Sequence, residues 1–261
     1  MLLNAVIIIL REVVEASLII SLFLAFSQIS NHARPWILNA FLLGVISATI
    51  YGINISVVSQ WFDGVGQEVI NAALQIIIYL VLLVFLITAM RRPKTALNNN
   101  VLTAMMMIGV ILASVREGSE IIIYIHGFIT VPELLQSVLL GSAIGAGIGL
   151  SIGVCIYYLL INMPINISVR VGYVLTVLFA GSMISQTVQQ LIQADWIMSQ
   201  YPIWDTSMWI SEYSVTGQVL YALIGYEATP TAIQITAYLS ALIIIILCSG
   251  YSWNHHQRLH K

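Results

Sequence analysis

Charged residues are scarce in this sequence. Asp, Glu, Lys and Arg together make up 8% of its 261 residues, whereas about 25% of a soluble globular domain is charged. Hydrophobic residues make up 59%. This composition excludes a water-soluble fold, and it gives no support for nucleic-acid binding.

Cysteine and the motifs of membrane enzymes are also nearly absent. The two cysteines, Cys155 and Cys248, lie inside apolar stretches and form no Cys-x-x-Cys pair, so neither a disulfide framework nor a thiolate metal site is indicated. The alternative from the enzyme class is an intramembrane protease. The sequence has no His-Glu-x-x-His helix and no pair of intramembrane aspartates, and only His126 could act as the base for a serine. We therefore predict that the protein is not an enzyme.

Long apolar runs dominate the sequence instead. A helix that crosses a bilayer needs about 20 apolar residues. Runs of this length lie at 2–27, 36–58, 69–90, 101–126, 135–160, 168–192 and 232–251. One longer loop, about 193–231, remains, and its stretch Val215 to Tyr226 can form an interfacial or re-entrant helix. We predict an all-α membrane protein of seven transmembrane helices, with a single transmembrane domain spanning residues 1–261.

The lysines and arginines between these runs predict the orientation. Alternate connections and the run ends beside them hold seven: Arg34, Arg91, Arg92, Lys94, Arg170 at the start of the run 168–192, Arg258 and Lys261. The N-terminus and the loops near 63, 132 and 193–231 hold none. Because positively charged loops stay in the cytoplasm, we predict an external N-terminus and a cytoplasmic C-terminus. The first run lacks a basic leader, so we interpret it as a permanent helix and not as a signal peptide.

A charged motif occurs twice in the chain. Arg11-Glu12-x-x-Glu15 recurs 105 residues later as Arg116-Glu117-x-x-Glu120. Each copy lies in the first helix of a group of three, and three spans separate the copies. We therefore predict an inverted 3+3 repeat, with repeat one at about 1–92, repeat two at about 101–195, and a C-terminal helix at about 232–251 as an addition. In transporters of this architecture the substrate binds near the middle of the bilayer.

These charges need a functional explanation, because each Arg or Asp at the centre of a spanning helix costs about 2.5 to 3.5 kcal/mol. Glu12 and Glu15 share one helix face, with Arg11 beside Glu15. The alternative is an intrahelical ion pair that only holds helices in register, but two symmetric copies favour a function. We predict a metal site of Glu12, Glu15, Glu117 and Glu120, oriented by ion pairs with Arg11 and Arg116. Carboxylates of this kind accept iron, and they also accept Mn²⁺, Ca²⁺ and Mg²⁺.

Other polar residues within or beside the spans predict a hydrophilic path. The candidates for this path or for a second shell are Glu68, Gln75, Tyr79, Gln186, Gln189, Asp195 and Asp205. Hydrogen bonds between helices, worth about 0.6 kcal/mol on average, are the alternative. Glycines at every fourth position from Gly141 to Gly153 predict close helix packing. The roles of His126 and of the tail histidines His255, His256 and His260 stay open.

The paired motifs in helices 1 and 4 of a seven-helix protein resemble the oxidase-dependent iron permease family, which includes the fungal high-affinity iron permease and bacterial iron-uptake permeases. The resemblance covers nearly the whole chain. It includes Gly66-Gln67-Glu68, Gln193-Ala194-Asp195-Trp196, and the segment from Trp204-Asp205-Thr206-Ser207 to Gly225-Tyr226. The family motif usually has Gly-Leu at its centre. Here Val13-Val14 stands in the first copy, and the second keeps only Gly118.

The resemblance implies import of iron, as the transported substrate, across a bacterial plasma membrane, with no organic cofactor. It also implies a ferric ion supplied by an extracytoplasmic oxidase, peroxidase or iron-binding protein. The partners are then the iron ion, the extracytoplasmic protein that supplies it, and membrane lipid. Two alternatives stay open: a carboxylate-relay importer of another divalent metal such as manganese or lead, and a non-transporting subunit that binds the oxidase.

The charge distribution generates a topology prediction. A tag before Leu2 is expected to be accessible from outside the cell, and a tag after Lys261 only from the cytoplasm, because the positively charged connections stay inside. Protease or dye accessibility in intact cells and in inverted vesicles measures this. Labelling of both tags from the same side would contradict an odd number of spans.

Overall fold

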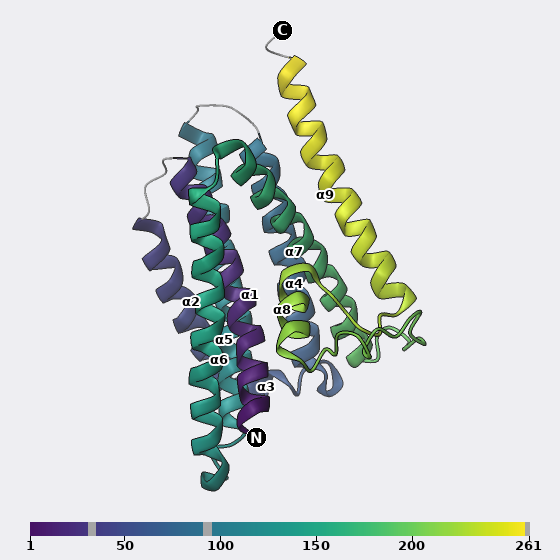
Figure 1. Cartoon of the computed structure of the whole chain (residues 1–261). Helices are drawn as coiled ribbons and strands as arrows, with labels where there is room; N and C mark the ends of the chain where they lie inside the picture. The colour runs from purple at the N-terminus through teal and green to yellow at the C-terminus, as the bar shows by residue number, and fades with distance from the viewer. Residues whose placement is uncertain (31–34, 91–95, 259–261) are drawn as a thin grey trace.

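The computed structural model describes residues 1–30, 35–90 and 96–258, and helices make up its regular structure (Figure 1). In chain order the elements are α1 (Leu2–Ile29), α2 (Pro35–Ile53), α3 (Ile55–Val58), the 3₁₀ turn η1 (Phe62–Gly64), α4 (Gly66–Met90), α5 (Ala96–His126), α6 (Pro132–Asn162), α7 (Ile165–Gln193), α8 (Val215–Ile224) and α9 (Ala232–Arg258). Every predicted apolar run lies within these helices. The run 36–58 is the one that is interrupted, at Asn54 between α2 and α3.

Within the described ranges, six helices are long and apolar enough to cross a membrane: α2, α4, α5, α6, α7 and α9. The helix α8 is apolar but has only 10 residues. It occupies the stretch for which an interfacial or re-entrant helix is expected. The helix α1 has 28 residues and carries Arg11, Glu12 and Glu15, and it does not belong to the group of six. An all-helical membrane protein is therefore the architecture.

Local sequence explains where several helices begin and end. Pro132 stands in the first turn of α6, where its missing amide hydrogen costs nothing. Pro164 precedes the first residue of α7. The side chain of Ser214 accepts a hydrogen bond from the amide of Gly217 and caps α8. Gly225 ends α8 in the left-handed conformation, at φ 70°.

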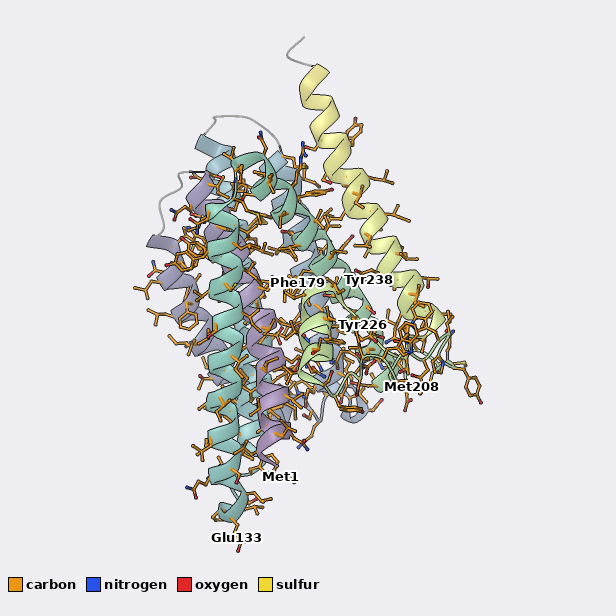
Figure 2. All side chains as sticks on the ribbon, in the orientation of Figure 1. Met1, Glu133, Phe179, Met208, Tyr226 and Tyr238 are labelled. Carbon is orange, nitrogen blue, oxygen red and sulfur yellow. The ribbon has the colours of Figure 1, made fainter. Side chains whose placement is uncertain are left out.

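The two termini lie at opposite ends of the helix bundle (Figure 1). The turn between α5 and α6 lies at the same end as the N-terminus, as Figure 2 shows for Met1 and Glu133. The turn between α2 and α4 and the long connection 194–231 lie toward this end too, and α9 leads from there to the C-terminus. Some residues named in the sequence analysis lie outside the described residues: Arg34, Arg91, Arg92, Lys94, His260 and Lys261. The side chains of His255, His256 and Arg258 also lie outside the described part of the structure.

A line of glycines lets α6 pack directly against the backbone of α1. A Cβ added to Gly145 would lie 2.5 Å from the carbonyl oxygen of Val6, and one added to Gly141 would lie 2.6 Å from that of Leu2. The hydroxyl groups of Ser17 and Ser21 donate to carbonyl oxygens of α6. The predicted close packing along this face is therefore present.

The same packing occurs a second time, between α2 and α5. A Cβ added to Gly44 would lie 2.5 Å from Cβ of Ser114, and one added to Gly52 would lie 2.9 Å from Cγ2 of Ile122. The small residues of α2 are Ala40, Gly44, Ala48 and Gly52, and each lies 101 positions before a glycine of the α6 line. Small residues of α6 and α2 thus bring these helices close to α1 and α5, which carry the motifs.

An apolar layer lies beyond the motifs, toward the C-terminal end of α1. The rings of Phe23 and Phe85 pack edge to face with centroids 4.8 Å apart, and Phe26 packs on Phe85 at 5.0 Å. Phe179, labelled in Figure 2, and Met183 of α7 are buried in the same cluster. These side chains of α1, α4 and α7 offer no polar group to the space between the three helices.

The glycine line generates a stability prediction. Gly145→Leu is expected to destabilise the fold by about 1 to 3 kcal/mol, because the added side chain meets the backbone of α1. Gly147→Leu on the same helix is the matched control, since a Cβ there meets nothing within 4 Å. Thermal unfolding of both variants in detergent measures the difference. Equal midpoints would show that α1 and α6 do not pack so closely.

Candidate metal site

The two charged motifs meet in the interior although 105 residues separate them in the sequence. Arg116 of α5 reaches across to Glu15 of α1, with 2.7 Å between Nη1 and Oε2, and both side chains are fully buried. The same Nη1 also pairs with Glu117, its neighbour in the chain. Nη2 donates to Oε1 of Gln186 on α7 at 2.8 Å. One guanidinium group thus joins three helices.

Arg11 has a different environment from its counterpart Arg116. Its Nε lies 3.3 Å from Oε1 of Glu15 and 3.8 Å from Oε1 of Glu12. The guanidinium group lies over the ring of Tyr221 on α8, 4.3 Å from the ring centroid, and Nη2 donates to the tyrosine hydroxyl. The side chain keeps 28% of its surface exposed. The two motifs are alike in sequence, but only one arginine is sealed inside.

The other three carboxylates form a cluster. One oxygen from each of Glu12, Glu117 and Glu120 lies within 4.8 Å of the others. Oε2 of Glu12 and Oε2 of Glu117 are buried without a hydrogen-bond partner. Among the residues that the structure describes, this is the group of His, Cys, Asp and Glu side chains that could hold a metal ion. Glu15 accepts from both arginines, and its own role as a ligand stays a prediction.

The formal charge of this region is negative. With all four carboxylates ionised, the two guanidinium groups leave a formal charge of −2 in a site that lies mostly out of contact with water. Burying unbalanced charge is expensive. A bound cation removes the imbalance, and its binding would satisfy oxygen atoms that otherwise lack a donor.

One of the residues predicted to line the path, Gln186, bonds to the motifs directly, and Gln75 and Gln189 are linked to them through one further side chain. The side-chain oxygen Oε1 of Gln186 accepts from Arg116 and also from Nε2 of Gln75 at 3.0 Å. Gln189 accepts from the hydroxyl of Tyr221 at 3.2 Å, beside Arg11. These glutamines are fixed by hydrogen bonds to the site, and a role in the path itself stays a prediction.

The remaining residues predicted for the path have other contacts. The hydroxyl of Tyr79 donates to the carbonyl oxygen of Ala241 on α9. Glu68 stands in the first turn of α4. Asp195 is exposed just after α7. Asp205 is exposed as well, and hydrogen bonds from Ser207 lower the pKa of its carboxyl group.

Sequence reasoning missed three residues beside the motifs. Asn71 of α4 donates from Nδ2 to Oε1 of Glu120 at 3.2 Å. It lies four positions before Gln75 on the same helix face, so the helical spacing could have identified it. Nothing in the sequence pattern points to Tyr221. Glu227 accepts from Ser185, next to Gln186, and burial raises the pKa of this carboxyl group to about 7, with a further contribution from the negative charge of Glu212.

Comparisons with known proteins identify the family of the chain. A sequence model described as the iron permease FTR1 family matches residues 2–254. No curated protein and no solved structure matches the chain. The matched range contains both motifs and every helix that packs around them. The chain therefore belongs to the iron permease FTR1 family.

Proposed function

We propose that this protein imports iron across a bacterial plasma membrane by binding the ion at its paired Arg-Glu-x-x-Glu motifs. The observation that carries the proposal is the cluster of Glu12, Glu117 and Glu120, whose oxygen atoms lie within 4.8 Å of one another. These residues come from two separate motifs of a chain that belongs to an iron permease family. Hard oxygen ligands of this kind bind iron.

The surroundings of the cluster support uptake from the N-terminal side, which the proposal places outside the cell. Polar side chains contact one another beside the motifs: Tyr221 and Glu227 belong to the long connection, and they bond to Gln189 and Ser185 of α7. Toward the other end lies the layer around Phe23 and Phe85. An ion at the cluster is therefore shielded from the cytoplasm, and its release requires the apolar layer to open.

An inverted repeat is part of the proposal. In it, α1 also crosses the membrane and brings the number of spans to seven. The first repeat is α1, α2 and α4, and the second is α5, α6 and α7. Three features support it: α1 and α5 run in opposite directions (Figure 1), α6 packs on α1 as α2 packs on α5, and the contacts correspond residue by residue. Gly145 meets Val6, for example, and Gly44 meets Ile111, 105 positions after Val6. Alternating access in such folds is a movement of one repeat against the other.

The redox state and the source of the ion are finer parts of the proposal. The family resemblance favours ferric iron handed over by an extracytoplasmic oxidase, peroxidase or iron-binding protein. The formal charge of −2 favours a second candidate, a divalent ion such as ferrous iron, manganese or lead, because a divalent ion makes the site neutral. Uptake of radioactive ferric and ferrous iron into proteoliposomes, with manganese and lead as competitors, distinguishes the two candidates.

The cluster predicts which carboxylates are essential. Glu117→Gln and Glu12→Gln are each expected to lower iron uptake at least about 10-fold, because the substitution removes a ligand charge and keeps the volume. Glu133→Gln, an exposed change at the tip of α6, is the matched control. Uptake into proteoliposomes at equal protein content measures the effect. Normal uptake in both cluster variants would refute the proposed site.

The two arginines predict an asymmetric response to lysine. Arg116→Lys is expected to reduce uptake more than Arg11→Lys, because one ammonium group cannot satisfy Glu15, Glu117 and Gln186 together. Arg11 is partly exposed, so water can replace some of its contacts. The same uptake assay, with thermal unfolding as a check on folding, measures both variants. Full uptake by both variants would show that the arginines act only as positive charges.

A further inference from the structure

Asn71 is the amide side chain that touches the carboxylate cluster from a third helix. It lies on α4 and keeps only 3% of its surface exposed. Its Nδ2 donates to Oε1 of Glu120 at 3.2 Å. Glu12 comes from α1 and Glu120 from α5, so Asn71 makes α4 the third helix that places a polar group at the cluster.

The contact with Glu120 determines how the amide is oriented. A carboxylate only accepts hydrogen bonds, so it must face the NH₂ group and not the carbonyl oxygen of the amide. The opposite orientation would place two acceptor oxygens against each other. Oδ1 of Asn71 therefore points away from that carboxylate oxygen, and it has no hydrogen-bond partner there.

An acceptor without a donor is costly inside a protein, at about 1 to 3 kcal/mol for each buried group. Here the same condition affects Oδ1 of Asn71, Oε2 of Glu12 and Oε2 of Glu117. While they are ionised, the nearby carboxylates cannot relieve one another, because a carboxylate only accepts hydrogen bonds. A cation is the kind of ligand that satisfies several oxygen acceptors at once.

The contact with Glu120 sets an upper bound on the distance of Oδ1 from the carboxylate, and this bound is close to what one shared ion needs. The oxygen and nitrogen of an amide are about 2.3 Å apart, so Oδ1 of Asn71 lies at most about 5.5 Å from Oε1 of Glu120. Two oxygen ligands of one ion, each about 2.0 to 2.6 Å from it, are separated by up to about 5 Å. The carboxylate oxygens already fall within this range, at 4.8 Å or less.

We propose that Oδ1 of Asn71 is a fourth ligand of the transported ion, alongside carboxylate oxygens of Glu12, Glu117 and Glu120. The proposal rests on the proposed function and adds a residue to the ion's coordination shell. A neutral carbonyl ligand adds an oxygen without adding charge. It also attaches α4 to the ion, so that ion binding joins α1, α4 and α5.

Gln75 provides a contrast one helical turn further along α4. Its Oε1 is also buried without a partner. Its amide nitrogen, however, donates to Gln186, which in turn is bound by Arg116. Gln75 thus contacts the arginine side of the network, whereas Asn71 contacts the carboxylate side. The ligand position is assigned to Asn71 for this reason.

The test compares two substitutions at Asn71 in purified protein in lipid nanodiscs. Asn71→Leu removes both the oxygen and the donor at similar volume, whereas Asn71→Asp keeps an oxygen ligand and loses the donor. Binding of Fe²⁺ under anaerobic conditions and of Mn²⁺ is measured by equilibrium dialysis. Asn54→Leu is the matched control, since Asn54 is exposed and bonds only to the carbonyl oxygen of Ile50 in its own helical segment.

The expected result is a loss of affinity in Asn71→Leu and its rescue in Asn71→Asp. Loss of even an outer-shell partner lowers metal affinity about 10- to 100-fold, so Asn71→Leu should lower it at least about 10-fold. Asn71→Asp should bind at least as tightly as the unaltered protein, and Asn54→Leu should be unchanged. Thermal unfolding of each variant identifies any that fail to fold, and a folded Asn71→Ala variant then replaces Asn71→Leu.

Two outcomes would overturn the assignment. Unchanged affinity in Asn71→Leu, or in Asn71→Ala, means that the oxygen does not bind the ion. Equal losses in Asn71→Leu and Asn71→Asp mean that Asn71 acts only by donating to Glu120. The proposed function has a separate readout: if Glu117→Gln still abolishes iron uptake while Asn71→Leu has no effect, only the Asn71 assignment fails. If the unaltered protein binds metal but transports no iron, the proposed function fails and the ligand assignment stands.

Discussion

The ion pair between Arg116 and Glu15 is the interaction on which the centre of this protein depends. Both side chains are fully buried, and they come from two helices that belong to different halves of the chain. Removing one partner of such a pair leaves an uncompensated buried charge, which costs about 3 to 5 kcal/mol. Because Arg116 also bonds to Glu117 and Gln186, it fixes α1, α5 and α7 around the site. Glu15 is thereby neutralised, while Glu12, Glu117 and Glu120 keep oxygens that a cation could bind.

Each of the two helices in this pair packs closely against a neighbour. Glycines of α6 and small residues of α2 let these helices pack against the backbones of α1 and α5. Lipid chains are as apolar as leucine, so packing contacts and hydrogen bonds, and not hydrophobic burial, hold helices together in a membrane. The serine hydroxyls of α1 that donate to carbonyl oxygens of α6 add to this packing. The packed helix pairs α1–α6 and α2–α5 then position the two motifs.

The surroundings of the motifs differ on their two sides. Polar groups of α7, α8 and the long connection lie on one side, and aromatic rings of α1 and α4 close the other. The arginines show the same difference, since Arg116 is sealed inside and Arg11 is partly exposed against Tyr221. Two copies of one sequence motif are therefore held in unlike environments. In a protein that works by alternating access, a movement of one repeat against the other would exchange the environments of the two motifs.

The sequence alone determined the helices and the location of the charged motifs. Apolar runs of bilayer length must become helices, because no water is present to satisfy their backbone groups, and this was enough to locate every long helix, α1 included. The repeated Arg-Glu-x-x-Glu motif identified the residues at the centre. The partners of each carboxylate were decided by tertiary structure. Nothing in the two motifs distinguishes Glu15, which is taken by both arginines, from Glu12, which is left with a free oxygen. Asn71 and Tyr221 also reach the site only through the packing of α4 and α8, because a side-chain contact between distant helices depends on crossing geometry that no local pattern encodes.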